Sequence, residues 1–172
     1  MGLVWREQMS VHNNLIDTEH KKLIDLINAV EVALNTDDNR NIVAETLDRL
    51  LEYTKTHFEH EEAIQQKIKN PLIDNHKEQH RRLIDEFFNI KASLDELLQL
   101  ESASESNSGE GDITDDELDD LLAGDDPEPA LSKQDLEPLV ELMRRWLVDH
   151  IIGTDLKLKP LLLKHSADLS YD

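Results

Sequence analysis

The sequence has no cysteine among its 172 residues, so disulfide bonds and thiolate metal sites are both excluded. It also lacks segments that alternate apolar and polar residues at every second position, the pattern typical of half-buried β-strands. Its length is enough for one domain with a sizeable core and hardly enough for two. We therefore expect a single all-α domain.

Long apolar runs are absent too. No stretch approaches the roughly eighteen consecutive apolar residues that a membrane-spanning helix needs. Residues 1–7 do not combine a basic region with an apolar one, as a secretion signal would. The expectation is a cytoplasmic protein that does not insert into membranes.

Basic residues are scarce. The chain has 18 Lys and Arg against 38 Asp and Glu, a formal net charge of −20, so its surface should repel nucleic acid phosphates and anionic lipids. Twelve of the acidic residues fall in residues 101–130, which contain no Lys or Arg. Nucleic acid is therefore not an expected partner, and the acidic charge is concentrated in one segment.

The chain does have four segments in which apolar residues recur at steps of three and four. They predict helices over about 17–34, 40–69, 72–100 and 133–153. Asp17 and Thr18 are candidate caps of the first helix, and Asn70-Pro71 should end the second. Four amphipathic helices without strands predict an antiparallel up-and-down four-helix bundle.

The remaining segments predict the domain organisation. Residues 1–16 have no clear period and should form an extended arm over the bundle. Residues 101–131 are rich in acid, Ser and Gly, and should be a mostly disordered insertion. One domain would then consist of residues 1–100, with the arm and three helices, and residues 132–172, with the fourth helix and a C-terminal turn.

Each predicted helix has residues that can bind metal on its apolar stripe. His76 and His80 are four residues apart on one helix, so their imidazoles lean the same way and can bind one ion. An imidazole or carboxylate buried on such a stripe is costly unless it is paired, hydrogen-bonded or bound to a metal. The full set of candidate ligands is His20, His57, Glu61, His76, His80, His150 and Asp155.

This set is too large for one tetrahedral zinc ion and suits two iron ions. Imidazole and carboxylate ligands without sulfur favour iron or manganese, although zinc or copper would also bind if supplied. Glu61 and Asp155 can each give one oxygen to each of two metals. With a bridging oxide or hydroxide, about one octahedral position is left open, where a small ligand such as O2 can bind.

The spacing of His150 and Asp155 needs a break in the helix. Five residues apart, they would lie about 140° apart around an ideal helix. Gly153 between them is where the turn can widen or end. Among the histidines outside the set, His60 shares the helix of His57 but faces away from its stripe, and we expect it in solvent.

Taken together, these motifs resemble the hemerythrin family of O2-binding di-iron proteins, and the bacteriohemerythrins in particular. The resemblance covers about residues 3–98 and 131–160. His12 departs from it, because members of the family often have glycine there. The matching motifs are DTEHKKL (17–23), HFEHEE (57–62), HKEQH (76–80) and WLVDHI (146–151) followed by Asp155.

The resemblance implies an assignment of the ligands and a function. It implies that His76, His80 and His150 bind one iron, that His20 and His57 bind the other, and that Glu61 and Asp155 bridge them. O2 would bind at the two-histidine iron, in an apolar pocket that excludes water. Our candidates for that pocket are Trp146, Leu147 and Ile151; ordinary core positions are the alternative.

Within the insertion, residues 114–123 predict a short amphipathic helix. Thr114 and Glu117 form a capping box, and Gly124 is a C-terminal stop. Such a short helix is marginal alone and would fold on a partner. Residues 110–126 resemble the acidic peptide of the flagellar motor switch protein that docks a chemotaxis response regulator; a merely solvating loop is the alternative. The candidate partner-binding residues are Ile113, Leu118, Leu121 and Leu122.

Two other functions compete with reversible O2 binding for sensing, storage or delivery. A di-iron oxidase or peroxide-handling enzyme of the ferritin-like class would use Glu-x-x-His motifs, and the chain has none. A phosphohydrolase of the His-Asp type is disfavoured because no His-Asp dipeptide occurs. A signalling adaptor that acts through the acidic loop is compatible with O2 binding. We expect a protein that is not an enzyme.

Overall fold

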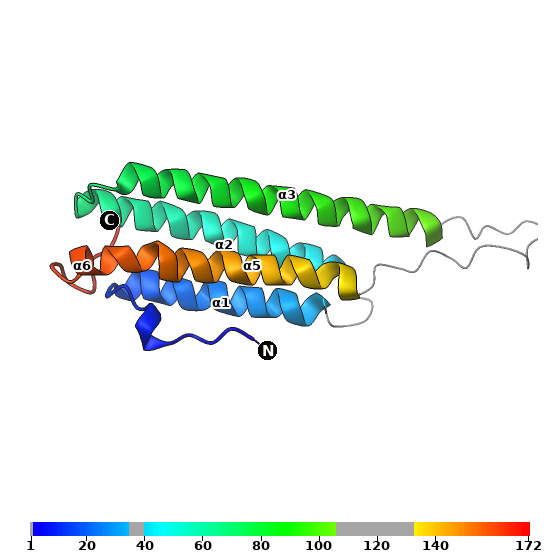
Figure 1. Ribbon diagram of the computed structural model, residues 1–172, viewed down its shortest axis with the longest axis horizontal. Coiled ribbons are helices and arrows are strands. Elements are labelled where there is room, and N and C mark those ends of the chain that lie inside the picture. Colours follow the sequence, from blue (N-terminus) through cyan, green and yellow to red (C-terminus); the bar gives the residue numbers. More distant parts are fainter. Residues whose placement is uncertain (1, 35–39, 106–132) are drawn as a thin grey trace, which may run out of the picture.

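The computed structural model describes the backbone of residues 2–34, 40–105 and 133–172, and side chains within 2–33, 42–92, 141 and 143–172. Four long helices run side by side along its length (Figure 1). Short elements flank them: η1 (Glu7–Met9), η2 (Asp155–Leu158) and α6 (Lys159–Leu162). The long helices are α1 (Asn14–Leu34), α2 (Arg40–Lys67), α3 (Ile73–Glu105) and α5 (Lys133–Gly153).

These helices form the predicted four-helix bundle. Successive long helices run in opposite directions (Figure 1), α1 packs against α2 and α5, and α2 packs against α3. The described part of the chain contains no strand. Nor does it contain a helix long and apolar enough to span a membrane. The all-α prediction is therefore confirmed.

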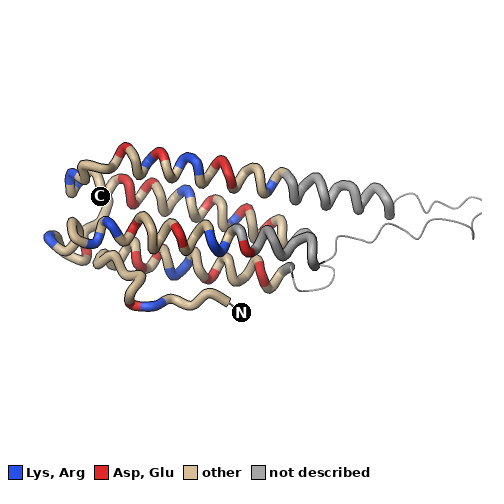
Figure 2. The backbone as a smooth tube through the Cα atoms, viewed as in Figure 1, with Lys and Arg blue, Asp and Glu red and all other residues tan. Residues whose placement is uncertain are grey.

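The core follows the predicted stripes. Leu23 and Ile27 of α1 and Leu47 and Leu50 of α2 are at most 1% exposed. Many exposed positions are charged, and Figure 2 shows Lys and Arg interspersed with Asp and Glu along α1, α2 and α3. Along α1 and α2, the three- and four-residue periodicity thus identified the buried face correctly.

The start of α1 corrects the prediction. The helix begins at Asn14, and Asn13 is its cap, because the Asn13 side-chain oxygen accepts the Ile16 N–H at 3.1 Å. Asp17 lies inside the first turn, where its carboxylate accepts hydrogen bonds from the Ser10 hydroxyl and the Val11 N–H. The prediction of Asp17 and Thr18 as caps was therefore wrong.

The arm before α1 is fixed to the bundle. The Leu3 N–H donates to the Asn28 side-chain oxygen at 2.7 Å, and the Asn28 amide nitrogen donates back to the Leu3 carbonyl at 2.9 Å. Further on, His12 has a φ of 68°, in the left-handed region that favours glycine. Glycine, the residue that the resemblance led us to expect at this position, adopts such a φ without strain.

The turn between α2 and α3 also contains a left-handed residue. Lys69 has a φ of 53°; its N–H donates to the Gln66 carbonyl, and the Asn70 N–H donates to the Gln65 carbonyl at 3.0 Å. This is the Schellman arrangement that ends a helix, with lysine where glycine is usual. The helix ends just before Asn70-Pro71, as predicted.

The end of α3 shifts the predicted boundary of the insertion. The helix runs to Glu105, so residues 101–105, expected to be disordered, are helical. Residues 106–132 lie outside the described part of the chain. They include the predicted helix at 114–123 and the candidate partner-binding residues, which therefore stay predictions.

Candidate metal centre

The seven candidate ligands meet inside the bundle. None is more than 5% exposed. Because each lies on the inward stripe of its helix, the packing of the helices brings all of them to one level of the core. His20 comes from α1, His57 and Glu61 from α2, His76 and His80 from α3, His150 from the end of α5, and Asp155 from the start of η2.

The ligand atoms fall into two overlapping groups. In each group, one ligand atom from every member lies within 4.8 Å of those of the others. The first consists of His76, His80 and His150 with the two carboxylates, and the second of His20 and His57 with the same two carboxylates. Glu61 and Asp155 are thus shared, and the cluster has two neighbouring positions for a metal ion.

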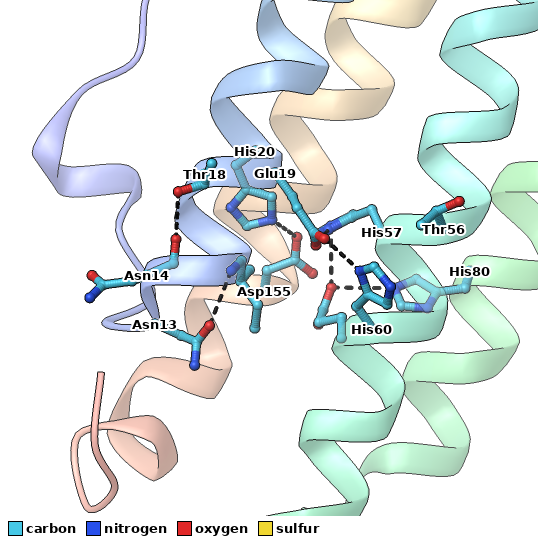
Figure 3. A network of polar contacts seen from close by, with 12 residues as sticks. Asn13, Asn14, Thr18, Glu19, His20, Thr56, His57, His60, His80 and Asp155 are labelled. Carbon is cyan, nitrogen blue, oxygen red and sulfur yellow. Dashed lines mark hydrogen bonds and ion pairs between the residues drawn. The ribbon is translucent and has the colours of Figure 1, made fainter. Parts of the chain in front are cut away.

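Asp155 directs one oxygen to each group. Its Oδ2 lies 3.2 Å from His20 Nε2, whereas its Oδ1 lies 3.1 Å from His150 Nε2 and 3.3 Å from His76 Nε2. Figure 3 shows the contact between the Asp155 carboxylate and the His20 ring. A carboxylate in this orientation can bridge two metal ions.

Glu61 is oriented in the same way from the opposite helix. Its Oε1 lies 3.0 Å from His76 Nε2, and its Oε2 lies 3.5 Å from His57 Nε2. These two histidines, the nearest to Glu61, belong to different groups. Glu61 therefore also spans the two positions.

The break after α5 falls at the predicted place. The helix ends at Gly153, the Thr154 N–H donates to the His150 carbonyl at 2.8 Å, and η2 begins at Asp155. Thr154 has a φ of −116° and a ψ of −60°, so the chain departs from helical geometry between His150 and Asp155. This change of direction lets both side chains face the same cluster.

The hydrogen bonding of the cluster fits a metal site. Within the described residues, fully buried atoms without a hydrogen-bond partner include Nε2 of His20, His57 and His76, Oε2 of Glu61 and both carboxylate oxygens of Asp155. They face one another across 3.0–3.5 Å without hydrogen-bond alignment. Leaving this many polar atoms unpaired would be costly, and metal ions between them would satisfy all of them. Imidazole nitrogens and carboxylate oxygens are the ligands that suit non-haem iron.

The histidines of the three-histidine group differ in the direction in which their pKa values are shifted. Burial, together with the neighbouring His150, holds the pKa of His80 far below its usual range, and burial also lowers the pKa of His150. Burial acts against protonation of His76 as well, but Asp155 and Glu61 outweigh it and raise its pKa to about 10. Neutral imidazoles are ready to bind metal, whereas a charged His76 compensates the carboxylates in place of a metal ion.

The structure adds residues that the sequence analysis missed. Glu19 is 5% exposed, and its two carboxylate oxygens lie 2.9 Å from His57 Nδ1 and 2.6 Å from His60 Nδ1 (Figure 3). The His60 ring also stacks on Tyr171, with ring centroids 3.9 Å apart. His60 is therefore half-buried and hydrogen-bonded, and the expectation that it is solvated was wrong.

A second carboxylate supports the other group of ligands. Glu62 Oε1 lies 2.8 Å from His80 Nδ1. The Phe58 ring stacks on the His80 ring, with ring centroids 3.7 Å apart and an angle of 5° between the ring planes. Carboxylates on the far nitrogen of a ligand histidine fix its tautomer and its orientation. The sequence held one signal for these residues: Glu19 and Glu62 each directly adjoin a candidate ligand.

The candidate pocket residues are all buried in the main apolar core. Trp146 is 8% exposed, and Leu147 and Ile151 are 1% exposed. Trp146 also lines a cleft of about 350 Å³ between α3 and α5, together with His150 and Gln79. That cleft lies beside the three-histidine group, so Trp146 is not confined to the two-histidine side.

Fold and site define a class: a four-helix bundle whose core holds a buried cluster of histidines and shared carboxylates with two positions for metal ions. Residues 11–162 match the family described as "Hemerythrin HHE cation binding domain". The chain belongs to the hemerythrin family. Hemerythrins bind O2 at a non-haem di-iron centre, and this is the function that family membership indicates.

Individual relatives agree with that assignment. The chain is 28% identical over 153 residues to a bacteriohemerythrin of Stenotrophomonas maltophilia, covering 89% of this chain and 76% of the relative. It is 26% identical to a hemerythrin-like protein of Naegleria gruberi, with 92% of each chain covered. A crystal structure of wild-type hemerythrin superimposes with a TM-score of 0.64 at 20% identity, covering 93% of this chain and 97% of the other, and supports the fold.

Proposed function

We propose that this chain binds O2 reversibly at two iron ions held by the seven clustered side chains. His76, His80 and His150 would hold one iron, His20 and His57 would hold the other, and Glu61 and Asp155 would be shared between them. The observation that carries this assignment is the sharing of both carboxylates by the two groups of histidines. A single-metal site would give no reason for that sharing.

The unequal number of histidines would decide where O2 binds. With both carboxylates and a bridging oxide or hydroxide, six ligands would be available at the three-histidine position, the number that octahedral iron prefers, and five at the two-histidine position. Iron held there in the ferrous state would supply the electrons for binding O2. The surrounding side chains, Leu147 and Ile151 among them, exclude water from the cluster.

The experiment is a spectroscopic and analytical one on the purified protein. We expect two iron ions per chain, near-ultraviolet bands of an oxo-bridged ferric pair, and a visible band that appears with O2 and disappears on deoxygenation. Glu61→Ala should lower the iron content from two toward one or none. Two irons that bleach irreversibly while a substrate is turned over would instead indicate a di-iron oxidase or peroxide-handling enzyme.

O2 binding at this site would serve sensing, storage or delivery. A signalling role additionally requires a partner, and the sequence of residues 110–126 is its only support. A peptide of these residues should bind a chemotaxis response regulator in a titration, and the change of Leu121 and Leu122 to Ala should abolish binding. Binding that survives this change would refute the proposed contact.

A further inference from the structure

A line of three buried polar side chains connects the cluster to the turn between α2 and α3. Glu61 and Gln65 are 0% exposed, and Asn70 is 5% exposed. The Gln65 amide nitrogen donates to Glu61 Oε1 at 2.9 Å, and the Asn70 amide nitrogen donates to Gln65 Oε1 at 2.7 Å. Neither Gln65 nor Asn70 belongs to the metal-binding set.

The direction of this line is fixed by the backbone. A side-chain amide can usually be turned over, exchanging its donor and acceptor ends. Here the Leu72 N–H, which can only donate, donates to Asn70 Oδ1 at 3.1 Å. The Asn70 amide nitrogen must then face Gln65, whose oxygen accepts it, and the Gln65 amide nitrogen must face Glu61. Each amide has one orientation that satisfies both of its neighbours.

The two oxygens of Glu61 are made unequal as a result. Oε1 accepts the hydrogen bond of Gln65 and faces His76, whereas Oε2 has no hydrogen-bond partner among the described residues. The histidine nearest to Oε2 is His57, at 3.5 Å, and His80 Nε2 lies further off at 3.8 Å. A carboxylate held at one oxygen cannot rotate to offer both oxygens to the same ion. That restraint is what a bridging ligand requires.

We propose that Gln65 is a positioning residue that holds Glu61 in its bridging orientation, and that Asn70 sets the direction of the Gln65 amide. This inference rests on the proposed di-iron function. It assigns to the α2–α3 turn a part in metal binding. The turn acts through a series of hydrogen bonds, which we call the relay, from the Leu72 N–H through Asn70 and Gln65 to Glu61. Packing alone would give these two buried amides no preferred direction.

The substitution Asn70→Asp tests whether iron binding depends on the direction of these hydrogen bonds. Aspartate keeps an oxygen for the Leu72 N–H but has no donor for Gln65, so the Gln65 amide turns over and presents its oxygen to Glu61 Oε1. Two facing acceptors repel, and affinity for ferrous iron should fall by about 10–100-fold, the usual cost of losing an outer hydrogen bond in a metal site. Simple electrostatics predicts the opposite, because an added negative charge attracts a cation.

The readout is an anaerobic titration of the metal-free protein with Fe(II), resolved into two binding steps, with Mössbauer spectra to distinguish the two irons. Asn75→Asp, the same change at an exposed position of α3, is the control for charge and should not weaken binding. Thermal unfolding of each metal-free variant shows whether the fold is retained.

A double variant distinguishes hydrogen bonds that act in series from independent packing effects of the two side chains. Gln65→Met removes the donor to Glu61 at similar volume and should also weaken binding about 10–100-fold. In Asn70→Asp/Gln65→Met there is no amide left to turn over, so binding should be no weaker than in Gln65→Met alone. Independent packing effects would instead add.

The outcomes are distinct. Wild-type protein that does not bind two ferrous ions would contradict the proposed function itself. Wild-type protein that binds two, with Asn70→Asp binding as tightly or with additive effects in the double variant, would overturn the relay and leave the function standing. Weakened binding in both single variants without additivity supports it.

Discussion

Glu19 and His57 form a buried contact in which Oε2 of the carboxylate lies 2.9 Å from Nδ1 of the imidazole. The contact joins α1 to α2 and leaves Nε2 of His57 free to face the cluster, 3.5 Å from Glu61 Oε2. The ring of His57 is thus held by one carboxylate and directed at another. Such a pair fixes which nitrogen is available to a metal ion.

Glu19→Gln should therefore weaken iron binding at the two-histidine position. Glutamine is uncharged and has one acceptor oxygen in place of two, so it can accept from the Nδ1–H of only one of the two rings, and His57 loses its charged partner. We expect about 10–100-fold weaker binding of one of the two irons, with the other retained, measured by Fe(II) titration. Glu52→Gln, at an exposed position of α2, is the control. Equal weakening of both irons would contradict a local role for Glu19.

Iron affinity should rise with pH. In the metal-free protein the pKa of His76 is raised to about 10, so His76 holds a proton at neutral pH that a metal ion must displace. His80 and His150, whose pKa values are lowered, have no proton to lose there. Between pH 6.5 and 8 the apparent affinity for Fe(II) should increase by about tenfold per pH unit for each proton displaced.

Anaerobic titration in several buffers, with proton release measured in parallel, checks this slope. A pH-independent affinity over that interval would show that His76 is already neutral in the metal-free state.

Phe58→Ala should destabilise the fold and loosen His80. The Phe58 ring is 4% exposed, stacks on His80 and lies edge-on to His150 at 5.2 Å. Removing it leaves a cavity in the core, which should lower the free energy of unfolding by about 3–5 kcal/mol. Urea unfolding of the metal-free protein measures this, and Phe88→Ala, where the ring is 46% exposed, should cost much less.

Lys69→Gly should have the opposite effect on stability. A φ of 53° strains any residue with a Cβ, and glycine adopts it freely. The expected gain in the free energy of unfolding is up to about 1 kcal/mol. Arg49→Gly, at an exposed position in the middle of α2, should instead lose about 1 kcal/mol, because glycine weakens a helix interior. The same sign for both variants in urea unfolding would refute the role given to the left-handed turn.

The sequence predicted the bundle and its ligands because both depend on local periodicity. His57 and Glu61 fall on the same stripe as Leu47 and Leu50, so their inward direction follows from spacing alone. The break at Gly153 was predictable for the same reason, since five residues do not fit one face of a helix.

Other features depend on how the helices pack, and spacing does not contain that information. His60 faces away from its own stripe but toward Glu19 of the neighbouring helix and Tyr171 near the C-terminus. The cap of α1 was misplaced because Asn13 and Asp17 are equally good caps by residue type, and contacts with the arm decide between them. Gln65 and Asn70 became meaningful only once Glu61 was placed beside them.

The turn after α5 carries a ligand that both groups of the cluster share. His150 belongs to one group only, whereas Asp155, in the η2 turn that follows, belongs to both. Inserting or deleting a residue between His150 and Asp155 would therefore displace a carboxylate from both metal positions at once, whereas a substitution of His150 would reach only one of them.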